Sequence, residues 1–93
     1  MRFTVVWQSP AEVELARLWN NATGPLRDAI RLAADQIDRI LGQAPDTAGE
    51  SRENAFKRMF FVRPLAVHYE VMMQDRIVKV LSVHLLPQVP EGE

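Results

Sequence analysis

The sequence contains no cysteine, no long apolar run and no large excess of charge of either sign, and each absence excludes a class of protein. Without cysteine the chain forms no disulfide and offers no thiolate to a metal. No apolar stretch approaches the roughly 20 residues that a membrane span requires. The N-terminal segment MRFTVVWQSP lacks the apolar region and the small-residue cleavage site of a signal peptide. We therefore expect a cytoplasmic protein that does not enter a membrane.

The 93 residues suffice for one small domain. We expect residues 1–93 to form it, with a flexible tail from 87 to 93. Residues 1–50 carry five arginines against seven acids, whereas residues 51–86 carry six lysines and arginines against three acids. The net charge of −1 hides this asymmetry, and the chain lacks the strongly basic character of most nucleic-acid-binding domains. A modest basic face on the second half is still compatible with the composition.

The first half predicts a short strand followed by a helix. Residues 3–7 are mostly β-branched and aromatic, as in a strand. Ser9 is placed to cap the helix, Pro10 occupies its first position, and Glu12 completes a capping box. Apolar residues then recur at helical spacing, and we expect both tryptophans of the chain in the core. The apolar stripe consists of Ala11, Leu15, Leu18, Trp19 and Ala22, and the other tryptophan is Trp7.

A second helix is predicted over about residues 26–41, and Gly42 is placed to be the C′ residue that ends it. The tight turn around Gly24 makes the two helices an antiparallel hairpin. Residues 43–54, QAPDTAGESREN, contain turn-forming and short polar residues without periodicity, so a loop is predicted there. The apolar face of the second helix consists of Leu26, Ala29, Ile30, Ala33, Ile37, Ile40 and Leu41.

The second half predicts three strands joined by connections so short that they can link only antiparallel neighbours. The resulting order is β-α-α-β-β-β. This order gives an α+β domain in which a helical hairpin packs on one face of a mostly antiparallel four-stranded sheet. The three strands cover approximately residues 55–62, 66–73 and 76–86.

The register of the last hairpin is left open by the sequence. In the middle strand, polar His68 and Glu70 alternate with apolar residues, so one face is buried and the other is polar. The last strand has apolar residues at both odd-numbered and even-numbered positions, so the pattern alone does not fix its register. A three-residue loop would place Ser82 and His84 on the face of His68, and a two-residue loop would place Lys79 there. We favour the first register.

Several segments in a fixed order carry a resemblance to a known family. They are SPAE at 9–12, GESR at 49–52, FK at 56–57, PLAVHYEV at 64–71 and VKVLSVH at 78–84. Each segment alone is common, but their joint order in a chain of this length resembles the RelE/ParE superfamily of type II toxin–antitoxin toxins. Members of this superfamily are often labelled plasmid-stabilisation proteins.

The resemblance implies one fold and at least two activities. RelE-like members enter the ribosomal A site and cleave mRNA, with lysines and arginines on the strands activating the ribose 2′-hydroxyl and stabilising the phosphorane. ParE-like members lack that set of cations and resemble poisons of DNA gyrase. Either kind is neutralised by a cognate antitoxin encoded beside it. The implied partners are therefore an antitoxin and either gyrase or the ribosome with its mRNA.

The cationic positions of RelE-like members are mostly lost in this sequence. The first lysine of the family falls on Lys57, which matches. The second lysine falls on Met59, and the two arginines fall on Ala66 and Leu86. Cleavage of a phosphodiester needs positive charge aimed at the transition state, and removing one such donor typically slows a reaction on the order of 10²–10³-fold. The substitutions therefore predict a poor ribonuclease.

Two histidines are candidates to replace the missing cations. Histidine exchanges protons near neutral pH, and some ribosome-dependent relatives carry one near the end of the last strand, close to His84. In the favoured register His68 lies on the same face. Lys57, His68 and His84 are therefore the candidate catalytic residues.

A second group of residues is predicted to contact the target or the antitoxin. These are cations and an aromatic residue in the strand half, where surplus apolar residues suggest a protein interface. No metal or other cofactor is expected, because two histidines without cysteine do not make a zinc site and no glycine-rich phosphate loop is present. The candidate contact residues are Arg52, Arg58, Phe61 and Arg63.

We therefore predict the toxin component of a type II toxin–antitoxin system, ParE-like in acting by binding a cellular target rather than by efficient RNA cleavage. Two alternatives remain open. One is a RelE-like ribosome-dependent endoribonuclease with an incomplete set of cations. The other is a non-toxic orphan member of the family.

Overall fold

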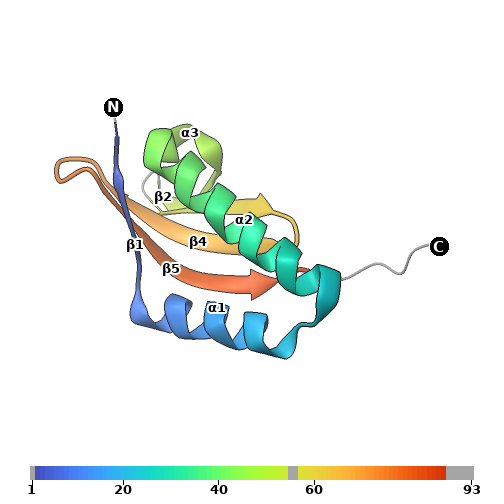
Figure 1. Ribbon diagram of the computed structural model, residues 1–93. Helices are drawn as coiled ribbons and strands as arrows, with labels where there is room; N and C mark the ends of the chain where they lie inside the picture. The colour runs from blue at the N-terminus through green and yellow to red at the C-terminus, as the bar shows by residue number, and fades with distance from the viewer. Residues whose placement is uncertain (1, 55–56, 88–93) are drawn as a thin grey trace.

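The fold is a five-stranded mixed sheet with a helical hairpin on one face, as the computed structural model of the chain shows (Figure 1). The structure describes residues 2–54 and 57–87, except the side chains of 52–54. Most of the predicted flexible tail at 87–93 lies outside these residues. The elements are β1 (Thr4–Trp7), α1 (Ser9–Asn21), α2 (Gly24–Gln43), α3 (Pro45–Ala48), β2 (Glu50–Asn54), β3 (Lys57–Val62), β4 (Leu65–Met72) and β5 (Ile77–Leu85).

The strand order is β1-β5-β4-β3-β2, so the first and the last strand are neighbours. β1 pairs with β5 in parallel, from Thr4 opposite Ile77 to Trp7 opposite Val80. The other strand pairs are antiparallel, as the short connections predicted. The α+β class and the order of the main elements are confirmed. The prediction of a four-stranded sheet is wrong.

The additional strand comes from the segment that was predicted to be a loop. Residues 43–54 contain the end of α2, the one-turn helix α3, and β2, which pairs with β3. β2 is a short edge strand of polar residues, and its register shifts between Ser51 and Asn54. Main-chain hydrogen bonds to one neighbour hold such a strand, so its sequence need not alternate between apolar and polar residues.

The start of α1 differs from the prediction. Gln8 is the N-cap residue, and no side chain makes a capping hydrogen bond. Ser9 is the first helical residue rather than the cap, so the predicted capping box with Glu12 is wrong. Pro10 lies in the first turn, where its missing N–H leaves no helical hydrogen bond unmade.

The second helix is longer than its predicted span of 26–41 and runs from Gly24 to Gln43. Gly42 therefore lies within the helix, and the prediction that it ends the helix is wrong. A Cβ atom at Gly42 would lie 3.5 Å from the carbonyl oxygen of Phe3, whose N–H donates to the Gly42 carbonyl oxygen at 2.8 Å. The hydrogen bond holds the segment leading into β1 against the last turn of α2, and a Cβ atom at Gly42 would make only ordinary van der Waals contact there.

The core lies between the helices and one face of the sheet, with α2 crossing the sheet and α1 beside β5 (Figure 1). Trp7 is half-buried against this core, whereas Trp19 is 37% exposed, so the prediction of a core position for Trp19 is wrong. The helices contribute Ala11, Leu18, Ala22, Ile30, Ala33, Ile37 and Leu41, and the sheet contributes Leu65, Val67, Tyr69, Val71, Val78, Val80 and Val83.

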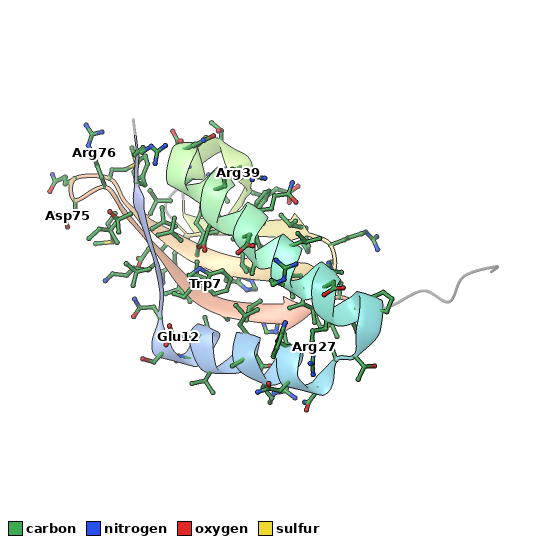
Figure 2. All side chains as sticks on the ribbon, in the orientation of Figure 1. Trp7, Glu12, Arg27, Arg39, Asp75 and Arg76 are labelled. Atoms are coloured by element: carbon green, nitrogen blue, oxygen red, sulfur yellow. The ribbon has the colours of Figure 1, made fainter. Side chains whose placement is uncertain are left out.

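The loop between β4 and β5 has four residues, from Met73 to Arg76, so neither predicted loop length is right. Figure 2 shows Asp75 and Arg76 at the tip of this hairpin, where the carbonyl oxygen of Arg76 accepts a hydrogen bond of 2.8 Å from the N–H of Thr4. The four-residue loop sets a register in which Lys79 lies opposite Glu70.

A β-bulge then changes the register in the middle of the hairpin. Tyr69 lies opposite Val80 but the preceding residue, His68, lies opposite Ser82, so Leu81 is an extra residue in β5. The bulge moves Ser82 to the face of His68, as the favoured register predicted. Each of the two registers considered from the sequence therefore describes one half of the hairpin.

Among the described residues, no helix combines the length and the apolar character needed to cross a membrane.

Candidate functional site on the outer face of the sheet

One face of the sheet turns away from the helices and carries the candidate site. Val67 and Tyr69 of β4 lie in the core, so His68 and Glu70 point in the opposite direction. Residues paired across neighbouring strands share a face, which extends the assignment to β3 and β5. We call this surface the outer face, and its members are Lys57, Met59, Phe61, Ala66, His68, Glu70, Met72, Ile77, Lys79, Ser82 and His84.

The two histidines are in contact on the outer face. Their ring centroids are 5.9 Å apart, and the ring planes are nearly perpendicular, at 87°. Nδ1 of His68 lies 3.2 Å from Oγ of Ser82, which is hydrogen-bond distance. The prediction that these three residues share a face is confirmed. A hydroxyl bonded to an imidazole is an arrangement through which a proton can be transferred.

Helix α1 brings a carboxylate close to His84. A hollow of about 490 Å³ is lined by Glu14 and Arg17 of α1 and by His84, among other residues. Nε of Arg17 donates to Oε1 of Glu14 at 3.0 Å. This hydrogen bond and the positive charge of Arg17 lower the pKa of the Glu14 carboxyl, with a small further contribution from His84. Glu14 is therefore ionised at neutral pH in the hollow that it shares with His84.

Nothing in the sequence connects Glu14 and Arg17 with the histidines. Their spacing of three residues predicts a mutual ion pair on a helix. This spacing carries no information about which strand the helix lies beside, because the position of α1 next to β5 depends on tertiary packing. The part of the site contributed by α1 was therefore missed.

Lysines flank Glu70 on both sides. Glu70 lies opposite Lys57 of β3 and opposite Lys79 of β5. Lys57 is thereby a diagonal neighbour of His68 on the same face. The three candidate catalytic residues, Lys57, His68 and His84, therefore all lie on the outer face.

Two of the three substituted positions, at which the resemblance to RelE-like members implies cations, lie beside the histidines. Met59 is opposite His68, and Ala66 is opposite His84. Ala66 is only 1% exposed although it is on the outer face, because the larger side chains around it cover its methyl group. The histidines are thus cross-strand neighbours of two of the three positions where the resemblance implies a cation that this chain lacks, the third being Leu86.

The candidate contact residues do not form one surface. Phe61 lies on the outer face opposite Ala66 and is 48% exposed. Arg63 is exposed in the turn between β3 and β4. Arg52 belongs to β2, and its side chain lies outside the described part of the chain.

Arg58 points toward the opposite face of the sheet from Phe61. Its pairing with Tyr69 puts it on the side of the helices. There its guanidinium donates to the carbonyl oxygen of Gly49 and, at 3.0 Å, to Oγ of Ser51. Arg58 thus ties the segment before β2 to the sheet.

No cluster of three or more potential metal ligands occurs among the residues that the structure describes.

The outer face can supply three kinds of interaction. These are proton transfer through His68 and His84, positive charge from lysines, and apolar contact through Phe61 and the methionines.

Comparison with solved structures finds the same fold in toxin–antitoxin proteins. The RelBE2 toxin–antitoxin complex from Mycobacterium tuberculosis contains a similar chain, with a TM-score of 0.71, 17% identity, and coverage of 91% of this chain and 92% of that chain. A chain of the chromosomal ParDE system from P. aeruginosa gives a TM-score of 0.72 and 14% identity, covering 92% and 98%. The isolated E. coli RelE toxin gives 0.63 and 17% identity, covering 94% and 87%.

No protein-family model matches the sequence, and comparison with curated proteins gives no significant match. The likeness is therefore one of structure, and it extends over nearly the whole chain in each case. The chain has the fold of the RelE/ParE toxin superfamily, which confirms the resemblance predicted from the sequence at the level of the fold. Both RelE and ParE systems are among the similar structures, so the fold does not choose between them.

Proposed function

We propose that the chain is the toxin component of a type II toxin–antitoxin system and acts by binding a cellular target rather than by cleaving RNA efficiently. The observation that carries this proposal is the chemistry of the outer face. Met59 and Ala66 occupy its centre where RelE-like chemistry needs cations, and the large apolar residue Phe61 is exposed beside them. Such a surface favours apolar contact with a protein over stabilisation of phosphoryl charge.

The similar structures support the class of function and the kind of partner. The RelBE2 and ParDE structures are toxin–antitoxin systems. By this analogy the chain is held inactive by a cognate antitoxin, and DNA gyrase is the candidate target of a ParE-like member. The small net charge of −1 agrees with a protein target better than with a nucleic-acid target.

Induced expression in a bacterial host, with separate measurements of mRNA cleavage and DNA supercoiling, tests the proposal. Growth arrest with intact mRNA is the expected result, accompanied by a change in supercoiling if gyrase is the target. Rapid ribosome-dependent mRNA cleavage in a purified translation reaction would refute it. Normal growth despite soluble, folded protein would favour the non-toxic alternative instead.

A ribosome-dependent endoribonuclease is the second candidate, and the placement of the histidines favours it. His68 and His84 lie opposite two of the three positions that lack cations, and His68 is hydrogen-bonded to Ser82. In this alternative the histidines transfer protons and Lys57 supplies charge. The purified translation reaction decides between the two, because the enzyme would cleave mRNA there and lose this activity on replacement of both histidines by alanine.

A further inference from the structure

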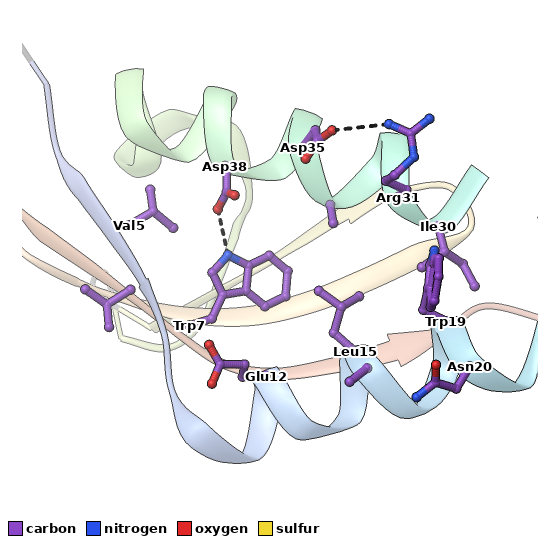
Figure 3. A pocket seen from close by; sticks show the side chains of 13 residues that line it. Val5, Trp7, Glu12, Leu15, Trp19, Asn20, Ile30, Arg31, Asp35 and Asp38 are labelled. Carbon is purple, nitrogen blue, oxygen red and sulfur yellow. Dashed lines mark hydrogen bonds and ion pairs between the residues drawn. The ribbon is translucent and has the colours of Figure 1, made fainter. Parts of the chain in front are cut away.

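A cleft separates the two long helices on the side of the molecule that the candidate site does not use. It has a volume of about 720 Å³, and β1, α1 and α2 all contribute to its walls. Figure 3 shows side chains from the three elements converging on it. This volume lies within the range of about 300–1,000 Å³ typical of small-molecule sites.

The interior of the cleft is apolar and aromatic. Leu15 of α1 and Ile30 of α2 lie within it, and Trp7 and Trp19 both line it. These are the two tryptophans of the whole chain. An apolar body that entered the cleft would therefore be removed from water and placed against indole rings.

The charged groups of the cleft are predominantly acidic. Glu12, Asp35 and Asp38 line it, against the single cation Arg31. Arg31 lies 3.9 Å from Asp35, so these two charges offset each other. The two remaining acidic residues of the lining are Glu12 and Asp38, and Figure 3 shows them on either side of the Trp7 side chain. Asp38 also accepts a hydrogen bond of 2.6 Å from Nε1 of Trp7.

Of the two tryptophans in the cleft, Trp19 has a cation over its ring. The guanidinium of Arg27 lies over the Trp19 ring, 4.3 Å from its centroid. Among the described residues no cation lies in this way over Trp7, although two carboxylates flank it. A cation is attracted both to the face of an indole ring and to carboxylates. Arg2 and Arg39 line a neighbouring hollow together with Trp7 and Asp38, so it is the side of Trp7 facing the cleft that is complementary to a positive charge.

We propose that this cleft is a binding site for a small organic cation, namely a primary ammonium group on an apolar body. The ammonium group lies between Glu12 and Asp38 against Trp7, and the apolar body extends along Leu15 toward Trp19. A neutral apolar molecule would leave the carboxylates without a partner, and an inorganic cation would leave the apolar walls unfilled. The site is separate from the outer face and does not depend on the proposed function.

Titration with n-hexylamine tests the proposal, because it is a primary ammonium ion at neutral pH. Intrinsic tryptophan fluorescence reports binding directly, since both tryptophans line the cleft. We expect a saturable fluorescence change with hexylamine, and binding weaker by at least about tenfold with n-hexanol, which has the same body without the charge.

Neutralising the carboxylates gives the matched variants. Glu12→Gln together with Asp38→Asn should weaken hexylamine binding by at least about tenfold. The asparagine amide oxygen can still accept the Trp7 hydrogen bond. Asp28→Asn removes a carboxylate of α2 that does not line the cleft, and it should bind hexylamine as the unaltered chain does. Circular dichroism checks that each variant is folded, and Glu12→Gln alone serves if the double variant is not.

Three outcomes would overturn the proposal. The first is the absence of saturation up to millimolar hexylamine in the folded chain, and the second is equal affinity for hexylamine and hexanol. The third is a short peptide with lysine between leucines, blocked at both ends, that binds at least about tenfold more tightly than hexylamine. That result would assign the cleft to a lysine side chain of a protein partner rather than to a small molecule.

Discussion

Met59 of β3 lies directly opposite His68 of β4 on the outer face. A position that would carry a lysine in a RelE-like enzyme is thus paired across the sheet with an ionisable residue. The same relationship recurs on the next strand pair, where Ala66 lies opposite His84. The outer face combines lysines and histidines with apolar residues, and replacing single residues can separate the two contributions.

Replacing both His68 and His84 by alanine is expected to leave growth arrest intact. If the chain acts by binding a target, proton transfer by the imidazoles is not required. Both side chains lie on the outer face, away from the core, so the fold should tolerate the change. The measurement is growth after induction at matched levels of soluble protein. Loss of growth arrest in the folded double variant, together with mRNA cleavage by the unaltered chain that the variant has lost, would contradict the binding proposal and favour the ribonuclease.

Phe61→Asp should weaken or abolish growth arrest. Phe61 is 48% exposed, so its contribution to the stability of the free chain is small, whereas a charge at this point would oppose apolar contact with a target. Leu32→Asp on α2 is the matched control, since Leu32 is 57% exposed and lies on the helix that crosses the opposite face of the sheet (Figure 1). Equal toxicity of both variants would show that the surface around Phe61 does not contact the target.

The stability of the chain should decrease above about pH 10 through the titration of Tyr69. Burial raises the pKa of this phenol, and the raising exceeds the lowering caused by the hydrogen bond to Arg58. The unfolded chain ionises its tyrosine at a lower pH than the folded chain does. The free energy of unfolding therefore falls as the pH rises from about 10 toward the pKa in the folded state.

Urea unfolding at a series of pH values, with Tyr69→Phe as the comparison, measures this effect. The variant should lose about 1 kcal/mol at neutral pH, because the Tyr69 hydroxyl donates to the Pro45 carbonyl oxygen at 2.7 Å. It should also show a smaller decline in alkaline solution. Since Tyr69 is the only tyrosine in the sequence, phenolate absorbance reports its ionisation alone. Parallel pH profiles of the two proteins would disprove the linkage.

Gly49→Ala should destabilise the chain by about 1–3 kcal/mol. A Cβ atom at this position would lie 2.3 Å from the Met59 carbonyl oxygen and 2.9 Å from the Tyr69 hydroxyl oxygen, so the main chain must shift. Thermal unfolding measures the loss. Gly24→Ala is a control with a different cause, because nothing lies within 4 Å of a Cβ there and its φ of 56° alone is unfavourable for alanine. An unchanged unfolding temperature for Gly49→Ala would mean that β2 is not held close to β3.

Ile37→Ala should cost about 2–5 kcal/mol. Ile37 is 0% exposed on the face of α2 that packs against the sheet, and its removal leaves a cavity. Leu32→Ala on the same helix is the control, since Leu32 is 57% exposed and its replacement should change stability little. Urea denaturation of both variants gives the comparison, and similar losses would show that α2 buries a different face.

The sequence predicted the elements in which one buried face requires a regular spacing of apolar residues. The apolar face of α2 and the alternation of His68 and Glu70 with buried residues in β4 were both visible. The edge strand β2 could not be predicted in this way, because main-chain hydrogen bonds rather than an apolar face hold its polar residues in the sheet. The bulge at Leu81 could not be predicted either, since β5 has apolar residues on both of its faces. The position of Glu14 near His84 depends on how α1 packs against β5, which no local pattern encodes.

The parallel pairing of β1 with β5 also has a consequence for synthesis. Thr4 and its neighbours are translated long before their partners from Ile77 to Val80. The outer face has the same timing, because Lys79, Ser82 and His84 complete it. A nascent chain can form the helical hairpin first, since its contacts are local. The surface that we propose to bind a target is therefore completed only after β5 has been translated, later than the helical hairpin.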